Sequence, residues 1–289
     1  MAETVLDADD RRDFLELRDL DHWVGGSECR LAGDPFALRA NTTAWNRYAG
    51  AVANDSGSRL LPVAHLTLHD TERTVRDIEW CASMGLRGAM IAPSLVDGKR
   101  LSHPELDPVW AAFAATGVAP VFHVGSFPKP FGDGWYADDP DEINPVLSSV
   151  FLGTAPALAI ADLAVNGVFA RHPDLRLGVM ELSAVWVPMF LLTLDGGFDF
   201  HATFNGAPLT EMELRPSEYV RRQVRVAAFS YEQPASLIGK CGDLFMACSD
   251  YPHSEGAADL RGPYEAAGST ADTEPGLLGE NLAWLFRLD

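Results

Sequence analysis

Six short apolar runs constrain the fold of this chain more than any other feature. Each run is rich in Val, Leu, Ile and Phe, and longer stretches with apolar residues at helical spacing separate them. The runs are Leu60–Leu68, Leu86–Ala92, Val118–Gly125, Leu175–Leu182, Val224–Phe229 and Leu244–Asp250. They are nearly continuous in apolar residues, as is typical of strands that are covered on both faces. The pattern predicts an α/β protein with a parallel sheet.

The intervening stretches predict seven helices. These are Thr71–Met84, His103–Thr116, Thr154–Arg171, Trp186–Asp195, Pro216–Arg222, Glu232–Lys240 and Leu277–Leu288. Residues 1–55 carry no convincing strand, so we expect a helical N-terminal segment that packs on a β/α barrel domain of residues 56–289. Two loops, Phe127–Pro145 and Tyr251–Ser269, directly follow predicted strands, where parallel β/α proteins build their active sites.

Composition excludes several classes of function. The 289 residues are 47% hydrophobic, enough for one sizeable core, and the net charge of −19 repels nucleic acids and anionic membrane surfaces. The acidic N-terminus does not resemble a secretory signal, and no apolar run reaches the ~18 residues that span a bilayer. Four cysteines without CxxC spacing are too few for a disulfide framework. We therefore expect a cytoplasmic protein that acts on a small molecule.

Three polar residues stand at the carboxyl ends of predicted strands: His123, Glu181 and Asp250. A barrel brings such ends to one mouth, so residues that are distant in sequence become neighbours there. A carboxylate at the end of a buried strand is costly unless it is paired or binds a cation, which favours a functional role for Asp250. His65 lies within its apolar run, and we expect it to be a hydrogen-bonded core residue.

The motif Ser249-Asp250-Tyr251-Pro252-His253-Ser254-Glu255-Gly256 places two carboxylates and an imidazole in a segment that leaves a strand. Pro252 stiffens the turn, which predicts that His253 is held over the mouth. The ordinary alternative is that Asp250 caps the turn and His253 is merely exposed.

Several segments resemble the amidohydrolase-related family, a group of metal-dependent hydrolases and decarboxylases typified by aminocarboxymuconate semialdehyde decarboxylase. The segments are VAPVFHVG (118–125), RHPDLRLGVMELSAVWVPMFLLTLD (171–195), SEYVRRQVRV (217–226), CSDYPHSEG (248–256) and GENLAWLF (279–286). The resemblance implies a distorted (β/α)₈ TIM-barrel fold with one divalent ion, commonly zinc. It also implies that His123 is a metal ligand and that Asp250 binds metal and moves protons.

The chain departs from the family pattern in two ways. Family members usually open with a strand that carries His-x-His, which supplies half of the metal site, and no His-x-His occurs here. Six strands rather than eight agree with an N-terminally incomplete barrel. In addition, Glu181 stands where the decarboxylase-like members carry a catalytic histidine.

The number of ligands decides which chemistry is feasible. A catalytic zinc takes about three protein ligands, and His123 and Asp250 supply two. With Glu181 as a third ligand the site is rich in oxygen and suits Mn or Fe better than Zn; His253 is the other candidate ligand. A metal-bound water could then be activated with Asp250 as general base, Glu181 as a further catalytic group and His253 positioning the substrate.

The leading hypothesis is a metal-dependent enzyme that hydrolyses or non-oxidatively decarboxylates a small organic acid, ester, amide or lactone. An aromatic wall would bind this substrate, with Lys129 or Arg261 holding a carboxylate. The wall consists of Phe127, Trp135, Tyr136 and Tyr251. One alternative is an inert or truncated barrel that binds a ligand or partner, with an exposed seam that promotes a homodimer. Another is an iron-dependent oxygenase.

Overall fold

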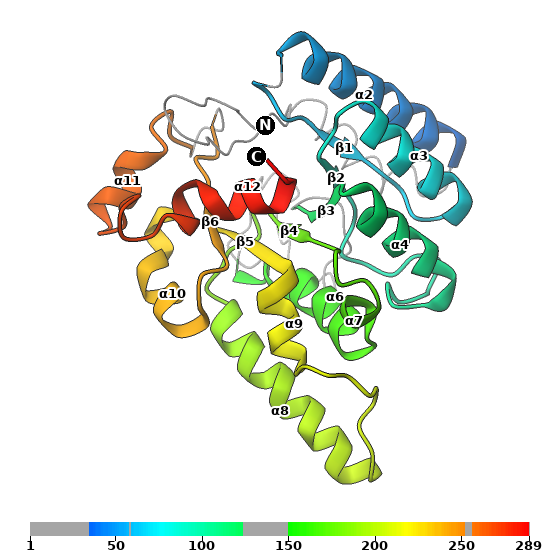
Figure 1. Cartoon of the computed structure of the whole chain (residues 1–289), viewed down its shortest axis with the longest axis vertical. Coiled ribbons are helices and arrows are strands. Elements are labelled where there is room, and N and C mark those ends of the chain that lie inside the picture. The colour runs from blue at the N-terminus through cyan, green and yellow to red at the C-terminus, as the bar shows by residue number, and fades with distance from the viewer. Residues whose placement is uncertain (1–34, 58, 124–149, 252–255, 289) are drawn as a thin grey trace, which may run out of the picture.

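A computed structural model describes residues 35–57, 59–123, 150–251 and 256–288 (Figure 1). Its described strands form one parallel six-stranded sheet in the sequential order β1-β2-β3-β4-β5-β6. The strands are β1 (Val63–His65), β2 (Gly88–Met90), β3 (Ala119–Phe122), β4 (Leu177–Val179), β5 (Val224–Ala228) and β6 (Phe245–Ala247). All six predicted strands are confirmed. Sequential parallel order is the order of a β/α barrel, whereas doubly wound sheets reverse direction at a switch point.

Helices connect successive strands. They are α2 (Pro35–Asp55), α3 (Thr71–Ser83), η1 (Pro104–Leu106), α4 (Asp107–Thr116), α6 (Thr154–Val165), α7 (Val168–Arg171), α8 (Val187–Asn205), α9 (Pro216–Gln223), η3 (Ser230–Glu232), α10 (Pro234–Cys241), α11 (Arg261–Ala266), η4 (Gly276–Glu280) and α12 (Asn281–Phe286). In the described ranges no helix combines the length and the apolar character needed to cross a membrane.

The helices differ from prediction at several places, and the C-terminal helix expected over Leu277–Leu288 is interrupted by non-helical Leu278 and Gly279 between η4 and α12. The stretch expected as one helix over Thr154–Arg171 is broken at Gly167, whose left-handed φ of 72° begins α7. Helix α8 runs ten residues beyond the predicted end at Asp195. Helix α11 forms inside Tyr251–Ser269, which was expected to be a loop.

The sheet buries a different apolar cluster on each face. One face packs against the outer helices through residues such as Ala64, Phe122 and Val179. The alternate residues of the same strands form the inner cluster, which includes Val63, Val121 and Met246 together with Leu285 and Phe286 of α12. Figure 1 shows α12 lying across the sheet on the side away from the outer helices. Burial on both faces explains why the strand sequences are continuously apolar.

Side chains of α2 cover the free edge of β1. The Trp45 indole N–H donates to the Val63 carbonyl oxygen at 2.9 Å, and the Asn46 amide donates to the His65 carbonyl oxygen at 2.9 Å. The Asn46 carbonyl oxygen also accepts from the His65 backbone N–H at 2.7 Å. Asn46 thus replaces the hydrogen bonds of a neighbouring strand. The open seam that a truncated, inert barrel predicts is therefore closed at this edge.

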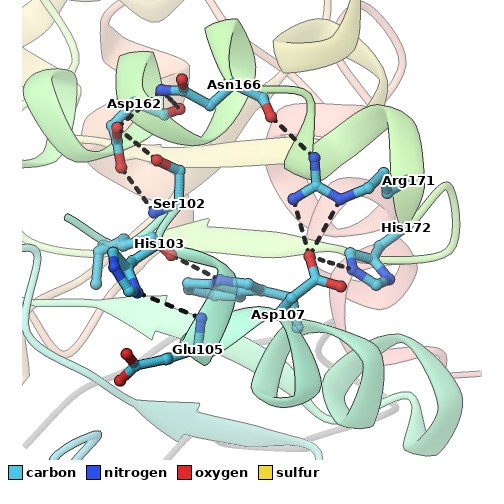
Figure 2. Close-up of polar contacts among 10 residues, drawn as sticks. Ser102, His103, Glu105, Asp107, Asp162, Asn166, Arg171 and His172 are labelled. Carbon is cyan, nitrogen blue, oxygen red and sulfur yellow. Dashed lines mark hydrogen bonds and ion pairs between the residues drawn. The ribbon is translucent and has the colours of Figure 1, made fainter. Parts of the chain in front are cut away.

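Carboxylates also clamp the outer helices to one another (Figure 2). Asp162 of α6 accepts from the backbone N–H and the hydroxyl of Ser102, both at 2.8 Å. Asp107 at the start of α4 accepts from the Arg171 guanidinium at 2.8 Å and lies 3.2 Å from the His172 imidazole. These contacts join the second and third β/α units on the outside of the barrel, so His172 has a structural role.

Candidate active site

The site lies at the carboxyl edge of the sheet, where the predicted residues end their strands. His123 directly follows β3 and is 4% exposed, and Glu181 lies two residues beyond β4. Asp250 lies three residues beyond β6 and is 8% exposed. Because neighbouring parallel strands end at the same edge, β3 and β4 place two of these residues side by side.

His123 and Glu181 form a direct pair. The His123 Nε2 atom lies 2.9 Å from the Glu181 Oε2 atom. An acid beside an imidazole stabilises its protonated form and fixes the orientation of the ring. The imidazole is buried and the carboxylate is partly open to solvent, so the pair can present a proton to a ligand bound at the mouth.

His65 is a third histidine or carboxylate side chain near this pair, since its pKa responds to His123. It ends β1 and is buried, as expected, and alternation along the strand puts it on the inner face with Val63. Burial, followed by the nearby charge of His123, lowers the pKa of His65 to about 3. The His65 ring is therefore neutral at physiological pH.

A strained turn presents Glu181. Glu181 and Ser183 have positive φ values of 52° and 61°, and Asp250 adopts a φ of 51°. Such conformations are uncommon for non-glycine residues and cluster at functional sites. The buried Glu232 carboxylate holds the turn: it accepts from the Ser183 hydroxyl, from the Ala184 N–H at 3.0 Å and from the Phe229 N–H at 2.8 Å.

Carboxylates surround the Cys248 thiol. Burial raises its pKa, and the negative charges of Asp250, Glu232 and Glu181 raise it further, so this cysteine is a protonated thiol. The buried Tyr264 hydroxyl of α11 accepts from the Cys248 N–H at 2.9 Å and donates to the Ala228 carbonyl oxygen. Tyr264 thereby joins the ends of β5 and β6, and its contact at Cys248 lies two residues before Asp250.

The remaining predicted residues fall into two groups. Tyr251 is half exposed beside Asp250, and Arg261 begins α11. The others lie outside the described residues, so their expected roles stay predictions: Phe127, Lys129, Trp135, Tyr136 and His253.

The predicted metal ligands His123, Glu181 and Asp250 are suitable in chemistry, because an imidazole and two carboxylates bind divalent ions. In geometry they are not sufficient. Among the residues that the structure describes, no three His, Cys, Asp or Glu side chains converge closely enough to hold an ion. His123 and Glu181 instead contact each other. The described side chains alone do not form the usual site with three protein ligands.

Sequence reasoning missed three contributors. His65 was expected in the core, and its position within an apolar run gave no signal that it ends a strand near His123. Glu232 follows the fifth strand by four residues, which is a weak signal. Tyr264 carries no local signal, because its contact depends on how α11 returns to the sheet.

Comparison with known proteins identifies the class. The amidohydrolase family matches residues 33–288, and the chain belongs to this family. No curated protein matches the chain.

Several solved structures share the fold. An amidohydrolase from Mycobacterium avium subsp. paratuberculosis K-10 is 23% identical with a TM-score of 0.72, covering 89% of this chain and 67% of that one. A 5-carboxyvanillate decarboxylase from Novosphingobium aromaticivorans DSM 12444, complexed with manganese, is 20% identical with a TM-score of 0.73, covering 88% and 72%. A 2,6-dihydroxybenzoate decarboxylase from Rhizobium is 17% identical with a TM-score of 0.64, covering 87% and 79%.

Proposed function

We propose that this chain is an enzyme that non-oxidatively decarboxylates a small organic acid at the carboxyl edge of β3, β4 and β6. The observation that carries the proposal is the buried His123–Glu181 pair on the same edge as Asp250. Membership of the amidohydrolase family and the decarboxylases among its structural relatives support this reaction over others. Hydrolysis of an ester, amide or lactone at the same site is the competing outcome of the test.

His123 has the role of holding the substrate carboxylate. Glu181 contacts and orients the imidazole, so that a hydrogen bond from His123 can reach an anionic group at the mouth. Burial keeps His65 neutral.

Asp250 has the role of moving the proton. Its carboxyl group delivers a proton to the carbon that bears the carboxylate, the bond between that carbon and the carboxylate breaks, and its electron pair stays with the protonated carbon as CO₂ leaves. The Asp250 carboxylate then recovers a proton from water. A buried carboxyl at a strand end suits such acid–base work, because it is shielded from bulk solvent.

A divalent ion is the expected cofactor of the family. When bound, it would polarise the substrate carboxylate. Glu181 and Asp250 would supply oxygen donors and His123 a nitrogen donor. This set is richer in oxygen than in nitrogen, which favours Mn²⁺ over the Zn²⁺ that the family resemblance implies. A third ligand would have to come from outside the described residues, and the roles of His123, Glu181 and Asp250 above do not depend on it.

The test measures CO₂ release and aromatic product from 2,6-dihydroxybenzoate and 5-carboxyvanillate. We expect turnover by the wild type and a loss of at least about 100-fold in Asp250→Asn and His123→Gln. Asn is the appropriate replacement at position 250 because it tolerates positive φ. His172→Gln is the matched control, since its imidazole also faces a carboxylate but on the outer helices.

Two results would contradict the proposal. One is the absence of CO₂ release with either acid, with and without added Mn²⁺ or Zn²⁺. The other is cleavage of ester or lactone probes instead, which would assign hydrolysis to the site. Elemental mass spectrometry of the wild type and Asp250→Asn determines separately whether an ion is held: metal that is lost in the variant would place it at this edge.

A further inference from the structure

Three arginines lie at the amino edge of the sheet, at the end of the barrel opposite the candidate active site. Arg176 directly precedes β4, and Arg225 is the second residue of β5. Arg287 follows α12 and packs over Gly117, two residues before β3, where an added Cβ would lie 2.8 Å from the Arg287 Nε atom. Because β3, β4 and β5 are neighbours in the sheet, the three guanidinium groups lie at adjacent strand ends. We call them the arginine cluster.

The ring of Trp284 holds two members of the cluster. Trp284 belongs to α12, which lies across the sheet (Figure 1). The guanidinium carbon of Arg225 lies 3.9 Å from the ring centroid, and that of Arg176 lies 4.5 Å from it. Val224 and Val226 face the outer helices, so alternation along β5 turns Arg225 to the inner face, where α12 lies. These cation–π contacts position both guanidinium groups without neutralising their charge.

Among the described residues, the cluster donates hydrogen bonds only to neutral oxygens. Arg176 and Arg287 donate to backbone carbonyl oxygens, and Arg225 donates to two such oxygens and to the Asn281 Oδ1 atom at 2.6 Å. The Arg287 Nε atom is buried and has no partner in that part of the chain. A buried charged donor without a partner costs free energy, and a bound anion would remove that cost.

Three other arginines show the usual arrangement. Arg73, Arg171 and Arg215 contact carboxylates at 2.7, 2.8 and 3.0 Å. Carboxylates are abundant in this chain, which has 41 Asp and Glu against 22 Lys and Arg. The absence of an ion pair at the cluster, within the described ranges, is therefore a specific feature of the amino edge.

The cluster carries an excess of positive charge. Burial lowers the pKa of Arg225 to about 10, with Asp243 acting in the opposite direction and the charge of Arg176 in the same one. Burial and the charge of Arg287 also lower the pKa of Arg176, and Asp174 opposes them. Two nearby carboxylates thus act on three guanidinium groups. All three remain charged at physiological pH, but burial and mutual repulsion leave these charges less stable than in water.

We propose that the arginine cluster binds a phosphate group. The guanidinium fork matches the oxygens of both carboxylates and phosphates. A carboxylate offers two oxygens and one charge, whereas a phosphate group offers three acceptor oxygens and a charge of about −1.5 to −2 near pH 7. Only the phosphate can accept from all three arginines at once. Its source is either free inorganic phosphate or a small phosphorylated molecule, because the net charge of −19 disfavours an anionic membrane surface.

The first experiment is isothermal titration calorimetry of the full chain with inorganic phosphate at constant ionic strength. We expect the wild type to bind at a single class of site. Arg176→Gln and Arg287→Gln should each weaken binding by at least about 10-fold, because each removes a charge-assisted hydrogen bond. Arg73→Gln is the matched control, since it removes the same charge from α3, where Asp77 pairs with Arg73.

Titration with methyl phosphate distinguishes the two sources. Tighter binding of this ester than of inorganic phosphate would support the proposal with a phosphorylated molecule as the ligand. Weaker binding of the ester would support it with the free ion as the ligand.

Chemical modification tests the location in the wild type, so it does not depend on whether a variant folds. Phenylglyoxal reacts with accessible guanidinium groups, and peptide mass spectrometry follows each arginine separately. Inorganic phosphate should slow the modification of Arg176, Arg225 and Arg287. The modification of Arg73, whose guanidinium is paired with Asp77, should be unchanged.

Three outcomes would overturn the inference. The first is no heat of binding and no protection of the cluster at millimolar phosphate. The second is equal weakening by Arg73→Gln and by the two cluster variants. The third is loss of phosphate binding in His123→Gln but not in Arg176→Gln or Arg287→Gln, which would place the anion at the candidate active site. None of these readouts requires turnover, so the cluster can bind phosphate even if the proposed reaction is wrong.

Discussion

At the scale of single residues, the site is defined by which groups carry charge. His123 contacts the Glu181 carboxylate at 2.9 Å, whereas burial lowers the pKa of His65 to about 3. The His65 ring is therefore neutral, while His123 has a carboxylate as its partner. This difference gives the two histidines different roles although both lie at strand ends on the inner face.

The first prediction concerns stability against acid. The folded pKa of His65, about 3, is below its unfolded value of about 6.5, so the unfolded chain binds this proton first as the pH falls. The stability that depends on a neutral His65 is fully present above about pH 6.5 and is lost as the pH falls towards 3. Within that window the free energy of unfolding falls by about 1.4 kcal/mol for each pH unit, which gives a loss of roughly 2 kcal/mol between pH 7 and pH 5. In His65→Leu the free energy of unfolding should fall by about 2 kcal/mol less over the same pH range.

Urea unfolding at pH 7 and pH 5 measures this effect. His69→Leu is the control for the loss of a histidine, because the His69 ring is half exposed. If the free energy of unfolding changes equally between pH 7 and pH 5 in the wild type and in His65→Leu, His65 is not held neutral in the folded protein.

The second prediction concerns Glu232. Glu232→Gln replaces a carboxylate that accepts from Ser183, Ala184 and Phe229 by an amide with one acceptor oxygen. We expect a loss of about 1–3 kcal/mol in the free energy of unfolding, because buried donors lose their partners. Glu211→Gln, at an exposed position, is the control for the same chemical change. A loss no larger than that of the control would mean that the strained turn does not need this carboxylate.

At the scale of elements, the strands were predictable because burial on both faces leaves a continuous apolar run that is independent of the neighbouring segments. Helix ends were less predictable. Helix α8 continues through Gly196 and Gly197, residues that locally disfavour helix, because Arg215 binds Asp195 and Asp199 from twenty and sixteen residues away. Helix α11 depends in the same way on the distant contact of Tyr264 with the sheet.

The same distinction applies to the site. His123, Glu181 and Asp250 were predictable because a polar residue at the end of an apolar run is visible in the sequence. The roles of His65 and Glu232 were not, because they result from the order of the strands and from hydrogen bonds across 48 or more residues. Among the described residues, His123 and Glu181 contact each other directly and no three potential metal ligands converge, so the expected shared coordination of an ion stays a prediction.

The third prediction concerns the contact between α11 and the sheet. Tyr264→Phe removes the hydroxyl that accepts from the Cys248 N–H and leaves that buried donor without its partner. The free energy of unfolding should fall by about 1–3 kcal/mol. Tyr231→Phe, at a largely exposed tyrosine, should change it by less than about 0.5 kcal/mol. Similar values for both variants would show that the Tyr264 hydroxyl does not join β5 to β6.

At the scale of the whole molecule, the inner face of the sheet has two ends with different occupants. The carboxyl end carries the candidate site, and the opposite end is filled by α12. Gly88 and Gly178 make room for it, since a Cβ at Gly88 would lie 2.7 Å from the Phe286 ring and one at Gly178 would lie 2.9 Å from Leu285. The last helix of the chain is therefore part of the barrel core, and its packing should be coupled to the stability of every strand.

The fourth prediction follows from this coupling. Leu285 is fully buried in the inner cluster, so Leu285→Ala should cost about 2–5 kcal/mol, the range for a large cavity in a core. Leu209→Ala, at an exposed leucine, controls for the same change.

If α12 were a peripheral helix, Leu285→Ala would loosen it locally and leave the main unfolding transition in place. If it is part of the core, near-ultraviolet circular dichroism and tryptophan fluorescence should report one shifted transition, because the inner cluster joins α12 to strands from both halves of the sheet. Two separate transitions would show that the strands fold without α12 and would remove it from the barrel core.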